Sequence, residues 1–140
     1  MDTFAPIRPK NLDASLSRVK SYDEVNVEEF IEGDEYTYDT ICVDGNIVFE
    51  NVCFYRPNPL IARSNEWVSP QTLTVRDMTT EAIRAGVALG HDILKALEFK
   101  TGFTHMEEFY TANKEAVFGE IAACPAGAQT VDLMNYTCDW

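Results

Sequence analysis

Two glutamates, Glu107 and Glu120, have the chemistry and surroundings to bind a metal ion. Glu107 ends the run Thr-His-Met-Glu, and Glu120 lies within Val-Phe-Gly-Glu-Ile. A carboxylate in such an apolar strand is costly to bury alone, and two of them on neighbouring strands repel each other unless a cation lies between them. Mg²⁺ typically takes one or two carboxylates together with substrate phosphates. The pair therefore predicts a magnesium site; for either glutamate alone, exposure at a sheet edge is the alternative.

The elements that must position this pair are predominantly strands. Residues 103–132 predict two strands joined by a short polar connection, then a Pro/Gly turn and the start of a helix. Upstream, the runs 36–43 and 46–55 flank Asp44-Gly45, a strong two-residue hairpin signal. Apolar residues on both faces of the second run predict a strand that is covered on both sides. The predicted fold class is α+β, an antiparallel sheet with helices packed on it.

The periodicity of residues 80–99 predicts a helix. Its apolar stripe consists of Ile83, Val87, Gly90, Leu94 and Leu97. A second helix is expected to begin near Gln129. Between the hairpin and the first helix, residues 56–77 show no regular pattern, and we expect an ordered loop that covers part of the fold.

Composition bounds the function. The chain has 140 residues, 46% of them hydrophobic, and a formal net charge of -12. This length and composition suit one compact domain, and the acidity argues against nucleic acid or an anionic membrane as partner. No apolar run approaches the ~20 residues of a membrane span, and the N-terminus lacks a signal pattern. We expect a cytoplasmic protein whose cysteines (Cys42, Cys53, Cys124 and Cys138) are reduced and mostly buried.

Three segments, in this order, resemble the ATP-grasp superfamily, the fold of biotin carboxylase and D-alanine–D-alanine ligase. They are Val27–Glu35 (Val-Glu-Glu-Phe-Ile-Glu-Gly-Asp-Glu), similar to the family's hinge strand and the turn after it, then Thr104–Glu107 and Phe118–Pro125. The resemblance implies that residues 27–140 form a domain like the family's C-terminal lobe. Residues 1–26 are then a remnant of the small lobe or a linker, in which Ile7-Arg8-Pro9-Lys10 faintly resembles the lysine-bearing strand.

The resemblance also implies a nucleotide site. Glu28, with the backbone of Glu29 and Ile31, would hold adenine, and Glu35 would bind the ribose hydroxyls. Backbone N–H and C=O groups can recognise the adenine edge, and a carboxylate accepts hydrogen bonds from hydroxyls. No catalytic residue is assigned.

The metal ligands that the resemblance implies are Glu107 and the bridging Glu120, with Glu108 as the alternative to Glu107 because a one-residue register shift reverses its face. Two positions depart from the family pattern. Ala122 stands where an asparagine is usual, and Cys124 stands where an arginine is usual, whose fixed charge a thiol does not replace.

The predicted function is therefore the ATP- and Mg²⁺-binding part of a ligase. Such an enzyme forms an acyl phosphate from a small-molecule carboxylate and passes it to an amine-type nucleophile. The alternative is a non-catalytic fragment or interaction module that keeps the fold. A third class is a metal-binding domain without nucleotide, in which His105 and Glu107 hold zinc or another transition metal. For partners, a homo-oligomer and a missing N-terminal lobe both stay open.

Overall fold

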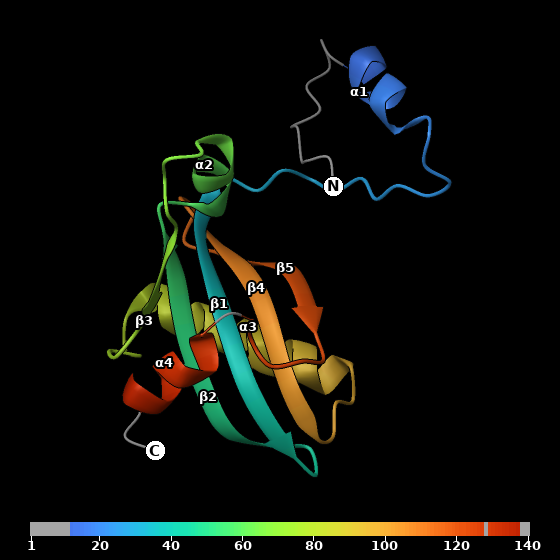
Figure 1. Ribbon diagram of the computed structural model, residues 1–140. Helices are drawn as coiled ribbons and strands as arrows, with labels where there is room; N and C mark the ends of the chain where they lie inside the picture. The colour runs from blue at the N-terminus through green and yellow to red at the C-terminus, as the bar shows by residue number, and fades with distance from the viewer. Residues whose placement is uncertain (1–11, 128, 138–140) are drawn as a thin grey trace. The chain divides into compact units, whose positions relative to one another are not determined.

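A computed structural model describes residues 12–127 and 129–137 of the chain (Figure 1). It has two compact units, Met1–Phe30 and Ile31–Trp140. The first contains helix α1 (Leu12–Val19), whereas residues 7–10 and Cys138 lie outside the described residues. That residues 1–26 are a remnant of the small lobe or a linker, and that residues 27–140 form a domain like the C-terminal lobe, stays a prediction.

The second unit is a five-stranded antiparallel sheet with helices on its faces, as the α+β prediction requires. The strand order is β3-β2-β1-β4-β5. The strands are β1 (Gly33–Val43), β2 (Asn46–Arg56), β3 (Gln71–Thr74), β4 (Gly102–Thr111) and β5 (Ala116–Ala122), and the helices are α2 (Pro59–Ser64), α3 (Glu81–Ala96) and α4 (Thr130–Thr137). The hairpin predicted at Asp44-Gly45 joins β1 to β2.

Helix α3 covers one face of the sheet and α4 lies against the other (Figure 1). The core between α3 and the sheet consists of Tyr38, Cys42, Val52, Ile83, Leu94 and Met106. Within α3, Gly86 lies against Glu108 and Gly90 against the Tyr38 ring, so the helix approaches the sheet closely. Of the predicted apolar stripe, Leu97 is instead exposed, because the helix ends before it.

Two sequence predictions of local structure are wrong. The first concerns Val27–Glu35, where the pattern predicts a strand at 27–31 that leaves through a turn at 32–35. Residues 27–31 form no strand, and Gly33 pairs with Thr111, so β1 begins at Gly33 and continues to Val43. The supposed irregular loop at 56–77 contains α2, which Asn58 caps through its side chain, and β3, which pairs with the end of β2. In both segments the strand forms because it pairs with another strand, which the local sequence does not indicate.

The prediction that β2 is covered on both sides is confirmed, since Val52 and Cys53 on its opposite faces are both fully buried. Cys42 and Cys53 are buried free thiols, whereas Cys124 is free and exposed. Across the residues described, no helix is long and apolar enough to cross a membrane.

Candidate functional site

Glu107 and Glu120 lie directly opposite each other on β4 and β5. The register shifts next to Glu107, so that Gly119 is an extra residue in β5 and Phe118 pairs with Glu108. A Cβ on Gly119 would lie 2.9 Å from the carbonyl oxygen of Glu107, so the bulge requires glycine at this position. The bulge therefore places Glu120 opposite Glu107, on the face of the sheet away from α3.

Glu35 lies on the same face. It is two residues before Thr37, which is the β1 partner of Glu107, and alternate residues of a strand share a face. The Asn58 side chain donates to Glu35 at 3.4 Å. The structure thus brings together Glu35, Glu107 and Glu120, three of the acids singled out in the sequence.

The predicted adenine-binding residues are divided between the two units. Glu28 and Glu29 are exposed and belong to the unit that ends at Phe30, while Ile31 begins the other unit, just before β1. Their contact with adenine stays a prediction.

A hydrogen-bonded pair beside the glutamates, Asp39 and His105, was not predicted. Asp39 is 3% exposed and accepts hydrogen bonds from Nδ1 of His105 at 2.6 Å and from the Thr37 hydroxyl at 3.2 Å. On the other side of the imidazole ring, Nε2 lies 3.7 Å from Oε1 of Glu107, an ion-pair distance. The sequence did contain a signal: Asp39 is the one acid in the apolar and polar run 36–43, and the same criterion singled out Glu107.

These two carboxylates, Asp39 first and then Glu107, raise the pKa of His105 from 6.5 to about 10. In metal-free buffer, we expect the His105 imidazole to stay protonated through neutral pH, with a midpoint near pH 10 in ¹⁵N NMR. Because the folded pKa lies above the unfolded one, this interaction stabilises the fold below pH 6.5 and the stabilisation is lost as the pH rises toward 10. Asp39→Asn should lower the midpoint; a wild-type midpoint near 6.5 would contradict the assignment.

Tyr55 of β2 is a second residue that sequence reasoning missed. Burial raises its pKa to about 12, and the nearby carboxylates of Glu107, Glu35 and Asp39 add to the increase. Its phenol therefore stays protonated and is available as a donor beside the acidic face. Nothing in the local sequence distinguishes Tyr55 from the other aromatic residues of the hairpin.

Glu108 does not belong to this face, so its proposed role as the alternative metal ligand is wrong. It points toward α3, where a Cβ on Gly86 would overlap its Oε1, and it is only 3% exposed. Its Oε2 has no hydrogen-bond partner among the described residues. Burial raises its pKa from 4.5 to about 7.

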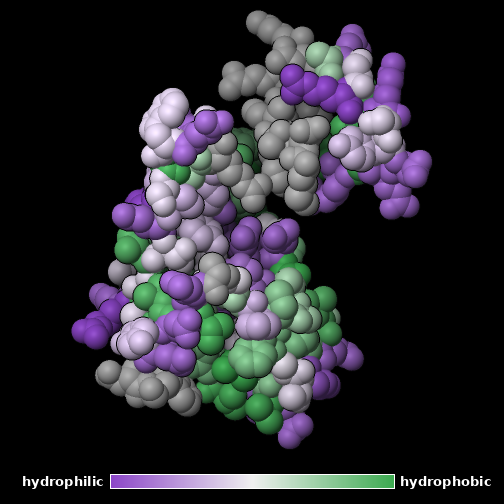
Figure 2. Space-filling model, viewed as in Figure 1, coloured by the Kyte–Doolittle hydropathy of each residue, from purple (hydrophilic) through white to green (hydrophobic). Residues whose placement is uncertain are grey.

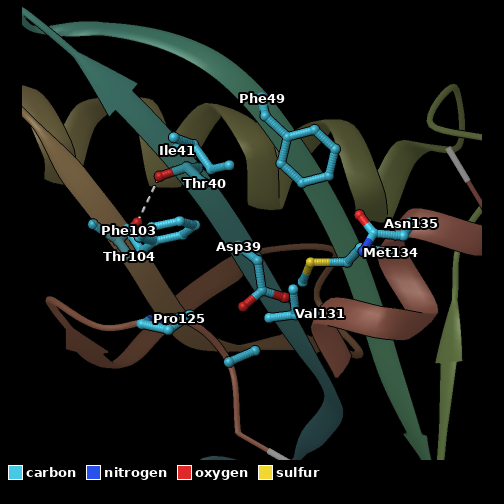
Figure 3. A pocket seen from close by; sticks show the side chains of 11 residues that line it. Asp39, Thr40, Ile41, Phe49, Phe103, Thr104, Pro125, Val131, Met134 and Asn135 are labelled. Carbon is cyan, nitrogen blue, oxygen red and sulfur yellow. Dashed lines mark hydrogen bonds between the residues drawn. The ribbon is translucent and has the colours of Figure 1, made fainter. Parts of the chain in front are cut away.

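A pocket of about 130 Å³ lies between α4 and the sheet, close to Asp39 (Figure 3). Its walls are mostly apolar and include Phe49, Phe103, Val131 and Met134. Figure 2 shows apolar surface gathered at this end of the sheet, over the β1–β2 hairpin, where Val43, Val48 and Phe103 are exposed.

The two carboxylates fit Mg²⁺ in kind and number, since this ion is commonly held by one or two carboxylates with water and phosphate oxygens. Two carboxylates directly opposite each other on paired strands destabilise the sheet unless a cation lies between them. Glu120 is exposed, so a cation from solvent can reach it. No cluster of three or more His, Cys, Asp or Glu side chains with metal-binding geometry occurs in the part of the chain described. A zinc site, which needs at least three such ligands, is therefore not assembled around His105.

Comparison with protein-family models found no match, and comparison with curated protein sequences found none. Solved structures do match. An L-amino acid ligase from Bacillus licheniformis is 17% identical with a TM-score of 0.70, over 91% of this chain and 30% of that one. D-alanine–D-alanine ligase from Bacillus anthracis, complexed with ATP, is 18% identical with a TM-score of 0.66, over 94% of this chain and 41% of that one. Phosphoribosylglycinamide synthetase from Anaerococcus prevotii is 14% identical with a TM-score of 0.61, over 91% of this chain and 32% of that one.

The chain therefore shares its fold with one part of each of these ligases, as the sequence resemblance predicts. It spans less than half the length of each of these structures.

Proposed function

We propose that this chain is the ATP- and Mg²⁺-binding part of a ligase that forms an acyl phosphate from a small-molecule carboxylate and passes it to an amine-type nucleophile. The observation that carries the proposal is the Glu107–Glu120 pair, held opposite each other by the bulge at Gly119 on the face that α3 leaves open. The ligase fold of the neighbours supports it, and one of them is a complex with ATP.

In this proposal, Glu107 and Glu120 hold the cation and Glu35 accepts hydrogen bonds from the ribose. Bound Mg²⁺ would neutralise charge on the ATP phosphates during transfer of the γ-phosphoryl group to the substrate carboxylate. The chain's own contribution is to fix these groups on paired strands, since positioning and charge stabilisation supply most of the catalysis in phosphoryl transfer. Glu28, Glu29 and Ile31 would complete the nucleotide site at the adenine.

A second candidate is a non-catalytic module with the same fold. The observation that favours it is Cys124, exposed at the position where the family resemblance implies an arginine. Without that guanidinium, a fixed positive charge toward the phosphates or the intermediate is absent from this position.

Titration with ATP and Mg²⁺ distinguishes the two candidates. We expect the wild type to be stabilised, by about 3 kcal/mol when the ligand is at 100 times its Kd, and Glu107→Gln/Glu120→Gln to lose this stabilisation. Thermal-shift and calorimetric measurements would check it. Without ligand, the double variant loses both the opposed like charges and the ion pair between Glu107 and His105, so circular dichroism and thermal unfolding of the unliganded protein would verify that it is folded.

The charge-matched control is Glu66→Gln/Glu115→Gln, at two exposed glutamates outside the site, which should keep the full response. An unchanged response in Glu107→Gln/Glu120→Gln would contradict the assigned metal ligands. No Mg²⁺-dependent response in the wild type would favour the non-catalytic module.

A further inference from the structure

The Asp39–His105 pair has the geometry of an anchor for one of the proposed metal ligands. Asp39 is nearly fully buried in the middle of β1 and is a direct β1 partner of His105. A hydrogen bond of 2.6 Å to Nδ1, supported by the Thr37 hydroxyl on the second carboxylate oxygen, fixes the plane and orientation of the imidazole ring. Short charge-assisted hydrogen bonds of this kind are stronger than neutral ones.

With Nδ1 held by Asp39, Nε2 is directed toward Glu107. The 3.7 Å separation from Oε1 is too long for a hydrogen bond but suits an ion pair. His105 and Glu107 lie on the same face of β4, two residues apart, and the side chain of His105 is only 19% exposed. The ring is thus a fixed group between the buried acid and the acid that faces Glu120.

We propose that Asp39 and His105 are positioning residues: Asp39 orients His105, and His105 holds the Glu107 carboxylate where it and Glu120 can share one divalent cation. This inference rests on the proposed function, since it concerns the same metal pair. Groups that orient metal ligands from behind typically contribute 10–100-fold to metal affinity.

The pair should therefore affect cation binding directly, in a measurement that does not depend on turnover. Mn²⁺ is a suitable probe, because its binding can be followed by electron paramagnetic resonance and by calorimetry, with and without ATP. We expect His105→Gln and Asp39→Asn each to weaken Mn²⁺ binding 10–100-fold. Because Asp39 acts through His105, the two losses should not add. The double variant should bind Mn²⁺ no more weakly than whichever single variant binds it less well.

The matched control is His91→Gln. Nε2 of His91 also contacts a carboxylate, that of Glu50, at 3.2 Å. This contact lies on the α3 side of the sheet, so Mn²⁺ binding should be unchanged. Asp39→Asn/His105→Gln also guards against loss of folding, because it leaves no buried charge without its partner. Circular dichroism would verify that each variant is folded.

The outcomes separate this inference from the function on which it rests. If Glu107→Gln abolishes Mn²⁺ binding while His105→Gln binds as the wild type does, the positioning role is overturned and the metal site stands. Tighter binding by His105→Gln would show that the imidazole competes with the cation for Glu107, and additive losses in the double variant would show that Asp39 acts independently; either result overturns the proposal. No binding by the wild type, or no effect of Glu107→Gln, overturns both.

Discussion

Replacing Glu108 with glutamine is expected to remove a large pH dependence from the stability of this protein. Glu108 lies beneath α3 with one oxygen lacking any hydrogen-bond partner in the described structure, and its pKa is raised from 4.5 to about 7. Relative to the wild type, the free energy of unfolding of Glu108→Gln should rise by about 3 kcal/mol between pH 4 and pH 8.

The sign follows from where the proton is bound. Below pH 4.5 the carboxyl is protonated in both folded and unfolded chains, so the variant and the wild type differ only by a constant. Between pH 4.5 and 7 the unfolded chain has lost the proton while the folded chain retains it, and above pH 7 the folded protein contains a buried charge. The wild type therefore loses stability through this interval.

Urea unfolding at several pH values, with each variant compared with the wild type at the same pH, would measure this difference. Comparing differences also cancels the constant cost of burying the glutamine amide. Glu115→Gln, in the exposed connection between β4 and β5, is the control and should show little change. A difference for Glu108→Gln that stays constant from pH 4 to pH 8 would mean that the carboxyl is not desolvated in the folded protein.

The sequence was informative where a local rule is strong. The Asp44-Gly45 hairpin, the helix with apolar residues at helical spacing and the two strands that carry Glu107 and Glu120 all follow from turn chemistry or periodicity. The resemblance to ATP-grasp ligases used only three short segments, and the structural neighbours confirm the fold from the arrangement of the whole sheet.

The predictions that were wrong concern segments whose structure depends on pairing with a distant strand. Gly33 looked like part of a turn because glycine beside acids is a turn signal, but its pairing with Thr111 makes it the first residue of β1. Likewise, Gln71–Thr74 is a strand because it pairs with the end of β2. Local propensity cannot report a partner that lies elsewhere in the sequence.

The site shows the same division. Residue type and spacing predicted Glu107 and Glu120 as a pair, and the structure places them opposite each other. They could not choose between Glu107 and Glu108, because the face of each depends on register. The bulge at Gly119 determines that Glu120 lies opposite Glu107 and that Phe118 lies opposite Glu108. The Asp39–His105 contact joins residues 66 positions apart in the chain, and no local pattern predicts it.

The close approach of α3 to the sheet provides the second large effect. Replacing Gly90 with alanine is expected to lower the free energy of unfolding by about 2 kcal/mol, and the Tm by roughly 10 °C. A Cβ at this position would overlap Cδ1 of the Tyr38 ring, so either the ring or the helix would have to move. The Tyr38 ring is 1% exposed and its hydroxyl donates to Glu50 at 2.6 Å, so it has little room to move. Overpacking should outweigh the ~1 kcal/mol by which alanine favours a helix over glycine.

Chemical and thermal unfolding of Gly90→Ala and of Gly127→Ala would measure this effect. Gly127 is the control because a Cβ there would meet no atom of the described residues within 4 Å, so its substitution should change stability by less than ~1 kcal/mol. If the contact with Tyr38 is the cause, adding Tyr38→Leu to Gly90→Ala should cost less than the two single substitutions together, since the smaller side chain relieves the overlap. Strict additivity would show that the contact with Tyr38 is not the cause of the loss. A Gly90→Ala variant as stable as the wild type would show that α3 can move away from the sheet at little cost.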